Sequence, residues 1–221
     1  MFDSQMINML IEGSWESIYM TVAITVISYI IGIPLGVFLV LSDRGGIRPM
    51  PGLNWLVGGI VNILRSVPFL ILMITIQPLT RLIVGTTIGT KAAIVALVVS
   101  AAPFVARMVE QSLLEIDHGV IEAAQSMGAS NMQIVMKVLL PESLPSLLNG
   151  ALVSATTILG YSAMAGFIGG GGLGDIAIRY GYNRYEMDTM FITVVLLVIL
   201  LQLIQSVGSR IAKRSDKRIN D

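Results

Sequence analysis

The sequence predicts an all-α polytopic membrane protein with five transmembrane helices, built as a single domain over residues 1–221. Of its 221 residues, 54% are hydrophobic and only 13% are charged, which is thin cover for the surface of a soluble domain. The charges also fall in clusters. Neutral runs over residues 18–41, 143–174 and 189–209 separate them. A bilayer core of roughly 30 Å requires about 20 apolar residues as helix, so each run is long enough to span it.

Two less uniform regions also predict spans. Residues 52–80 are apolar except for Arg65, and residues 92–106 carry no charge and continue helically through Arg107 and Glu110. Residues at i and i+3 lie on one helix face, so this arginine and glutamate can pair and lower the cost of leaving water. The five predicted spans are therefore about 15–41, 54–79, 89–114, 144–167 and 188–209.

The distribution of Lys and Arg predicts the orientation. An odd number of spans puts the two termini on opposite sides of the membrane. With Arg65 set aside as intramembrane, the predicted inner segments hold nine Lys and Arg and the outer segments hold four. The first seventeen residues contain none, so they are not expected to be a signal peptide. The positive-inside rule therefore places the N-terminus outside and the C-terminus in the cytoplasm. Five of the inner residues crowd the C-terminal tail, namely Arg210, Lys213, Arg214, Lys217 and Arg218.

The predicted cytoplasmic loop, residues 115–143, is too polar to span the membrane and too apolar for a solvated linker. Asp117 can cap a short helix over residues 120–127 that stops at Gly128, because glycine tolerates positive φ. Ser130 can cap a second helix that Pro141 ends. This predicts a helix-turn-helix suited to docking into a groove of another protein. The residues expected on its surface are Ile121, Glu122, Gln125 and Met127.

The same loop carries a specific resemblance. Its residues resemble the EAA signature of ABC importer permeases, E-A-A-x3-G-x9-I-x-L-P, with Val138 as the sole departure. The resemblance implies a type I ABC importer transmembrane domain in which this segment is the coupling helix, inserted into a cleft of a separate ATPase subunit. An ordinary amphipathic connector helix is the alternative. The residues implied in coupling are Ile121, Glu122, Ala123, Ala124, Gly128, Leu140 and Pro141.

The resemblance covers nearly the whole chain and is greatest to methionine importer permeases. Residues 65–69 are similar to the R-S-I-P-F run of their second span, residues 101–110 to their third span, and residues 160–164, with the glycines that follow, to their fourth. This implies a permease subunit for a small amino acid, most of all methionine, with both the L- and the D-form as candidates. Permeases for glycine betaine, choline-type osmoprotectants or other small amphiphiles are the alternative.

Five helices are too few to enclose a path with two gates, so a homodimer with the path on its axis is expected. The chain has no G-x-x-x-x-G-K-[ST] motif. ATP and Mg²⁺ are therefore expected to be used by two separate ABC ATPase subunits, and this chain is expected to be neither an enzyme nor a cofactor-binding protein. The resemblance also implies an extracytoplasmic solute-binding (lipo)protein and the plasma membrane of a prokaryote. Zero net charge gives no support for a nucleic-acid partner.

The fourth predicted span contains a candidate gate. Met164 lies among small residues, which mark a helix–helix contact surface, and its flexible side chain could plug a narrow pore. Plain packing is the alternative. Tyr161 and Ser162 are candidates for lining the same path. Arg65 is costly in an apolar stretch; it could face an anionic carboxylate or bond the carbonyls that Pro68 frees, and this second, structural role is favoured.

A glycine cluster follows the fourth span. Residues 169–174 contain G-x-G-x-x-G, but this motif holds a dinucleotide only within a βαβ unit. After a membrane helix it predicts instead an external or re-entrant turn where backbones pack closely. Gly169, Gly171 and Gly174 are candidates for contact with the solute-binding protein.

Other function classes find little support. The chain has no cysteine and one histidine, so neither a metal site nor a catalytic residue is predicted. A membrane-embedded enzyme would need clustered polar groups at membrane depth, and the predicted spans hold little beyond Arg65, Arg107 and Glu110. A self-sufficient channel or ion-coupled carrier would need a selectivity ring or intramembrane carboxylates, for which Glu110 alone is weak support.

Overall fold

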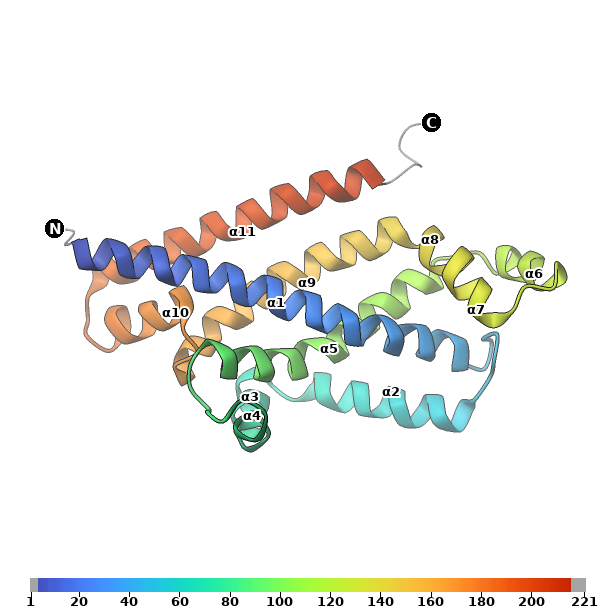
Figure 1. Ribbon diagram of the computed structural model, residues 1–221, viewed down its shortest axis with the longest axis horizontal. Coiled ribbons are helices and arrows are strands. Elements are labelled where there is room, and N and C mark those ends of the chain that lie inside the picture. Colours follow the sequence, from blue (N-terminus) through green and yellow to red (C-terminus); the bar gives the residue numbers. More distant parts are fainter. Residues whose placement is uncertain (1–3, 216–221) are drawn as a thin grey trace.

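The computed structural model describes residues 4–215, with side chains to residue 213, and shows an elongated helical bundle (Figure 1). No strand occurs among these residues, so the predicted all-α fold class is confirmed. Four helical stretches within residues 4–215 are long and apolar enough to cross a membrane, and one bent helix pair makes a fifth if it is counted as a single span. The basic residues Lys217 and Arg218 and the side chain of Arg214 lie outside the described part. The long helices are α1 (Ser4–Ser42), α5 (Thr90–Leu114), α9 (Leu144–Met164) and α11 (Met187–Ser215).

Shorter elements connect the long helices. α1 begins at the end of the bundle that also holds α10, whereas α6 and the turn after α1 lie at the opposite end (Figure 1). Between α1 and α5 lie α2 (Pro51–Ser66), α3 (Phe69–Thr75) and α4 (Gln77–Val84). Between α5 and α9 lie α6 (His118–Ser126), α7 (Asn131–Ile134), a π-helical turn (Val135–Leu139) and α8 (Leu140–Glu142). Between α9 and α11 lie a 3-10 turn (Ala165–Ile168), α10 (Gly172–Ile176) and a second π-helical turn (Ala177–Tyr182).

The helix over the second predicted span is broken. α2 ends at Ser66, α3 begins at Phe69, and the two axes differ by 106°. Pro68 has no N–H and disfavours helical geometry at the preceding residue, and Val67 is extended with φ −74° and ψ 128°. The stretch over residues 54–79 is therefore two helices at a steep angle followed by α4. Arg65 lies in the last turn of α2, where a positive charge interacts favourably with the helix dipole.

α1 and α5 form the centre of the bundle through small residues. An added Cβ at Gly32 would lie 2.5 Å from Val105 Cγ1, and one at Gly36 would lie 2.7 Å from the carbonyl oxygen of Ala106. Between lipid-embedded helices such close backbone approach supplies van der Waals contact that the hydrophobic effect does not. α5 presents a buried row of alanines to its neighbours, namely Ala92, Ala93, Ala96, Ala101, Ala102 and Ala106.

α1 also extends further than predicted. It begins at Ser4, although the predicted span begins at about residue 15. Leu10 is buried there in a cluster with Leu173 and Ile176, and an added Cβ at Gly13 would lie 2.4 Å from Ile176 Cδ1. Contact with α10 therefore keeps these additional turns helical, which no local pattern in α1 indicated.

The predicted Arg107–Glu110 pair is present, and Arg107 also forms hydrogen bonds with α2. Arg107 Nη1 lies 2.6 Å from Glu110 Oε2. Its Nη2 donates to the Asn62 side chain at 2.9 Å and to the Gly58 carbonyl at 3.2 Å. Since α2 buries only Gly58 and Val61, these bonds are a main connection between α2 and α5.

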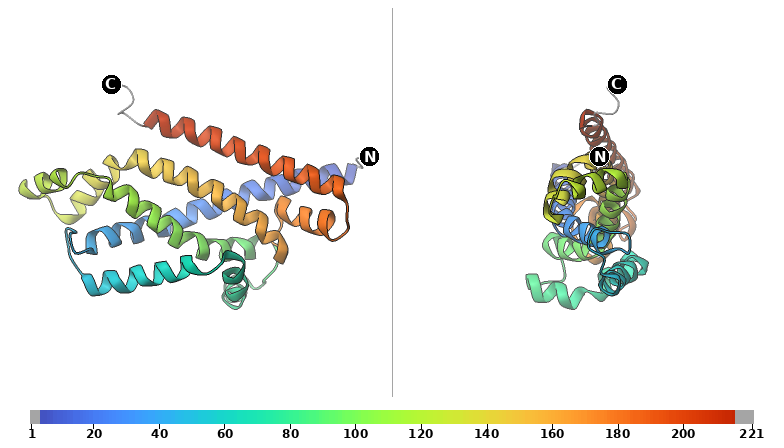
Figure 2. Two further views of the ribbon diagram at one scale, coloured as in Figure 1. Left: turned by 180° about the vertical axis from the view of Figure 1, so that it is seen from behind. Right: turned by 90° about the vertical axis from the view of Figure 1, so that its right-hand side faces the viewer.

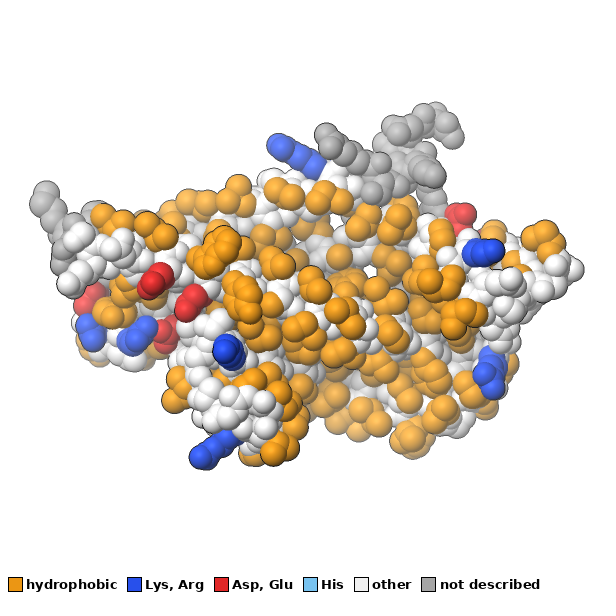
Figure 3. Space-filling view, viewed as in Figure 1, with side chains coloured by type: hydrophobic (Ala, Val, Ile, Leu, Met, Phe, Trp, Pro, Cys, Tyr) orange, Lys and Arg blue, Asp and Glu red, His pale blue; other side chains and the backbone are white. Residues whose placement is uncertain are grey.

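The surface of the bundle is mainly apolar in its middle, and most charged side chains gather toward its two ends (Figure 3). α11 lies at one edge of the bundle in both further views (Figure 2). Its exposed residues include Leu203 and Val207, both 55% exposed. An apolar surface of this extent on long helices is typical of contact with lipid or with another membrane helix.

Replacing Arg107 with alanine should lower the stability of the protein in mild detergent. The change removes one ion pair and two hydrogen bonds from a partly buried guanidinium, and bonds to charged groups contribute about 1.5–3 kcal/mol. We expect a loss of about 2 kcal/mol, measured as a lower thermal midpoint of monodisperse protein. Lys91→Ala is the matched control, because Lys91 is an exposed cation on the same helix. Equal midpoints for the two variants would contradict the structural role.

Candidate functional site

The predicted short helix of the cytoplasmic loop is α6, and both predicted caps are present. Asp117 Oδ1 accepts from the Gly119 N–H at 2.6 Å, and α6 runs from His118 to Ser126. Gly128 has φ +79°, which a residue with a side chain adopts only with strain. Ser130 caps α7 in a reciprocal arrangement with Gln133. The turn between α6 and α7 is therefore specified by local chemistry.

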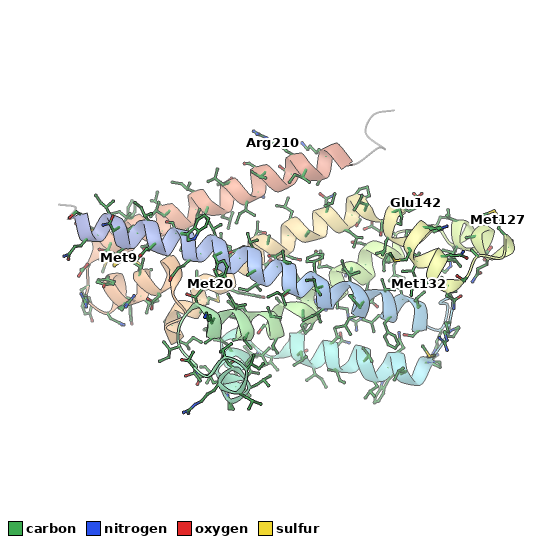
Figure 4. The ribbon with its side chains drawn as sticks, viewed as in Figure 1. Met9, Met20, Met127, Met132, Glu142 and Arg210 are labelled. Atoms are coloured by element: carbon green, nitrogen blue, oxygen red, sulfur yellow. The ribbon has the colours of Figure 1, made fainter. Side chains whose placement is uncertain are left out.

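α6 presents one face outward and one inward. Glu122 and Ala123 are exposed, and Met127 is 82% exposed at the tip of the molecule (Figure 4). Ala124 is buried against α5 and the π-helical turn, and Ile121 packs half-buried on the same cluster. Ile121, expected on the surface, is only partly accessible, and its side chain helps to anchor α6. The exposed face suits contact with a partner, since methionine adapts to irregular surfaces.

A cleft of ≈ 190 Å³ separates α6 from the turn that follows α1. Glu122 and Gln125 line it from α6, and Asp43 and Ile47 line it from the turn. α6 thus projects beyond the membrane-crossing helices, while its inner face remains tied to them.

The expectation that Pro141 ends the second helix was wrong, because the helical path runs on through α8 into α9. The Leu140 N–H bonds the Val135 carbonyl, a step of five residues. This π-helical turn widens the helix by one residue, which moves aside the carbonyl that a proline ring would strike in a regular α-helix. Ser143 then donates its N–H to the Leu139 carbonyl at 3.1 Å. The loop is consequently joined to α9 by nearly continuous helix.

The residues proposed for the gate and path are not equivalent. Met164 is 44% exposed at the end of α9, whereas Tyr161 stacks on Phe69 of α3 with ring centroids 4.4 Å apart. Ser162 is buried, and its hydroxyl donates to the Leu159 carbonyl at 2.8 Å. Ser162 therefore faces the interior of this chain rather than the surface that Met164 occupies.

Arg65 is exposed, and among residues 4–213 its side chain makes no hydrogen bond or ion pair. The favoured expectation, that it bonds the carbonyls freed by Pro68, is therefore wrong for this chain. At the end of α2, the Ser66 hydroxyl donates to the Asn62 carbonyl at 2.8 Å, and the Val67 N–H donates to the Ile63 carbonyl at 3.3 Å. The break leaves the guanidinium free to face a partner or the path.

The glycine cluster forms the close backbone contacts that the sequence predicts. Gly169 and Gly171 have φ of +70° and +83°. An added Cβ at Gly174 would lie 2.2 Å from the Ala163 carbonyl oxygen. Gly174 is buried, so it is not part of an external contact surface, whereas Gly169 and Gly171 are partly accessible. Their contact with a solute-binding protein stays a prediction.

Sequence reasoning missed two residues that hold this loop. Glu16 Oε2 accepts from the Gly172 N–H at 2.7 Å, and Ser17 Oγ accepts from the Leu173 N–H at 2.9 Å. The available signal was an acidic residue two positions before the neutral run over residues 18–41. Its partners are 156 residues away in the chain, so no local pattern connects them.

Gly174→Ala should destabilise the folded protein, because the new methyl group would overlap the Ala163 backbone and α10 would have to move. Overpacking of this kind costs about 1–3 kcal/mol or more. We expect a lower yield of monodisperse protein and a lower thermal midpoint. Gly59→Ala is the control, since no atom lies within 4 Å of an added Cβ there. A stable Gly174→Ala protein would show that this packing is loose.

Comparison with known proteins agrees with this arrangement. Residues 32–221 match the family model described as binding-protein-dependent transport system inner membrane component. The chain is 51% identical over 211 residues to a probable D-methionine transport system permease protein MetI of Vibrio cholerae, covering 96% of this chain and 94% of that protein. It is 52% identical to the D-methionine transport system permease protein MetI of Escherichia coli K12, and the match covers 72% of this chain and 73% of that protein.

Solved structures give the same result. A chain of the MetNI methionine ABC transporter in inward facing conformations aligns with a TM-score of 0.95 and 50% identity, covering 98% of this chain and 100% of that one. An amino acid ABC transporter crystallised with histidines aligns with a TM-score of 0.71 at 19% identity, which shows a shared fold alone. This chain belongs to the family of binding-protein-dependent transport system inner membrane components, the permease subunits of ABC importers.

Proposed function

We propose that this chain imports methionine, forming as a homodimer the membrane path of an ATP-driven transporter. The observation that supports methionine as the cargo is the 51% identity, over 96% of this chain, to a relative named for methionine transport. The 50% identity to a chain of a methionine ABC transporter agrees with it. Since small changes in a path can alter the cargo, the identity supports the substrate class more strongly than a preference between L- and D-methionine.

The energy comes from two ABC ATPase subunits, each of which receives one α6. The exposed face of α6 around Glu122 and Ala123 supplies the contact, with Met127 at its tip. Ile121 and Ala124 on the inner face, and Leu140 and Pro141 in the helical path to α9, transmit the motion. ATP and Mg²⁺ bind to those subunits, so this chain performs no catalysis itself.

The orientation follows from the same assignment. If α6 meets an ATPase, the end of the bundle that holds α6 is cytoplasmic, and the start of α1 at the opposite end is outside (Figure 1). The described basic residues Arg210 and Lys213 near the end of α11 agree with a cytoplasmic C-terminus. An extracytoplasmic solute-binding protein then delivers the cargo to the side where the glycine cluster lies.

Met164 is the gate in this proposal. It is exposed in one chain, at the outer end of α9, and a second chain across the dimer axis would bring two such side chains together. Tyr161 supports it through its stack on Phe69. Arg65, exposed and without a partner among residues 4–213, is a candidate for the wall of the path.

Reconstitution tests the function and the cargo together. The chain, its ATPase and its solute-binding protein in proteoliposomes should take up radiolabelled L-methionine only when ATP is enclosed with the ATPase domains. Unlabelled L- or D-methionine should compete, and glycine betaine should not. Uptake that needs an ion gradient but no ATP would support a carrier instead, and competition by betaine alone would overturn the cargo.

Gly128→Ala should uncouple ATP hydrolysis from uptake. At φ +79° an alanine is strained by about 1–2 kcal/mol, so the turn after α6 should open. We expect uptake to fall severalfold while the ATPase subunits still co-purify. Gly45→Ala is the matched control: it lies in a turn at the same end, has no positive φ, and no atom lies within 4 Å of an added Cβ. Normal uptake by the Gly128→Ala protein would contradict the proposed role of α6 in coupling.

A further inference from the structure

We propose that Glu16 is a positioning residue of the outer gate: from α1 it clamps the glycine loop that follows Met164. The inference rests on the proposed role of Met164 as the gate. The clamp is the pair of hydrogen bonds from the Gly172 N–H to Glu16 Oε2, 2.7 Å, and from the Leu173 N–H to Ser17 Oγ, 2.9 Å.

The clamp satisfies groups that would otherwise be unpaired. Gly172 and Leu173 are the first residues of a helical stretch that runs to Tyr182, and the first amides of a helix have no partner within it. A carboxylate at this end is also stabilised by the helix dipole. Among residues 4–213, no Lys or Arg forms a salt bridge with Glu16, so the charge is directed at the backbone.

The glycines of the loop are explained by this contact. Gly171 has φ 83° and ψ −174°, a conformation essentially limited to glycine. An added Cβ there would lie 2.8 Å from Glu16 Oε2 and 2.9 Å from Thr90 Oγ1. Gly172, with φ +73°, would meet Ser17 Oγ at 2.7 Å. The loop is therefore shaped to lie directly against α1, with α5 on its other side, where the Gly89 N–H bonds the Gly169 carbonyl at 2.8 Å.

The clamped segment touches the chain on both sides of Met164. Gly174 packs on Ala163, immediately before the gate residue. Gly166, just after it, packs on the same Gly174, with an added Cβ only 2.3 Å from the Gly174 carbonyl carbon. These are backbone contacts with no flexible side chain to absorb a displacement. A shift of α10 relative to α1 must therefore move the segment that carries Met164.

Through these hydrogen bonds, α1 restrains the segment that carries Met164. When Glu16 is engaged, α1, α5, the glycine loop and the end of α9 form one unit. When it is released, the end of α9 can move without α1. Met164 would then fail to open and close in step with ATP hydrolysis, although the ATPase subunits remain bound.

Two measurements on the assembled transporter test the proposal. Hydrogen exchange of the peptide that covers residues 170–176 should be about tenfold faster in Glu16→Ala, since a hydrogen bond to a charged group is lost. The ATP hydrolysed per methionine imported should rise about fivefold, a typical size for coupling between sites. Glu16→Gln keeps an acceptor oxygen but not the charge, so both readouts should lie between those of Glu16→Ala and the unaltered protein.

Glu12→Ala is the matched control, because Glu12 is an exposed carboxylate one helical turn earlier on α1. It should leave both readouts unchanged. Faster exchange in Glu16→Ala with an unchanged ATP-to-methionine ratio would reduce Glu16 to a structural residue and overturn the proposal. Failure of the unaltered transporter to import methionine would instead refute the proposed cargo, and the exchange measurement would still show whether the clamp exists.

Discussion

Close approach of helix backbones is the constraint on which this structure depends. Within a membrane, lipid is as apolar as leucine, so helices gain stability by packing tightly rather than by leaving water. Gly32 and Gly36 bring α1 onto α5, and Gly174 brings α10 onto Ala163 at the end of α9. At each of these places a single methyl group would overlap a neighbouring backbone or side chain. The bundle is therefore held by surfaces that fit in one arrangement.

Most buried hydroxyls bond a carbonyl of their own helix, but two sets of polar side chains connect elements that are distant in the chain. Arg107 joins α5 to α2 through the Gly58 carbonyl and the Asn62 side chain. Glu16 and Ser17 join α1 to the first residues of α10. A buried polar group needs a partner, and a bond formed away from water is not exchanged for one to solvent. These bonds fix the relative positions of helices whose apolar faces alone would allow sliding.

Local chemistry made much of this predictable. Charge-free runs located the long helices, and the caps at Asp117 and Ser130 defined α6 and α7. Three features depended on contacts that no local pattern contains. The angle at Pro68 follows from what α3 packs against, since the proline only specifies a break. The helix passes Pro141 because Ile134, Val135 and Leu139 are buried against α5 and keep the chain helical through a wide turn. Ser162, a candidate for lining the path, is buried, and Ile121, expected on the surface, is half-buried, because helix rotation and docking depend on the whole bundle.

The path between the two ends of the molecule is what makes the arrangement suitable for transport. From Asn131 to Met164 the chain is almost continuously helical, so a displacement that α6 passes through the Gly128 turn to α7 reaches the end of α9 along one helical path. Tight packing against α5 resists bending along the way, because interiors at close-packed density transmit strain. A displacement of this helical segment changes the position of Met164 relative to the rest of the bundle only if neighbouring elements stay in place. α3, through the Phe69–Tyr161 stack, and α1, through Glu16, are these elements on either side of Met164.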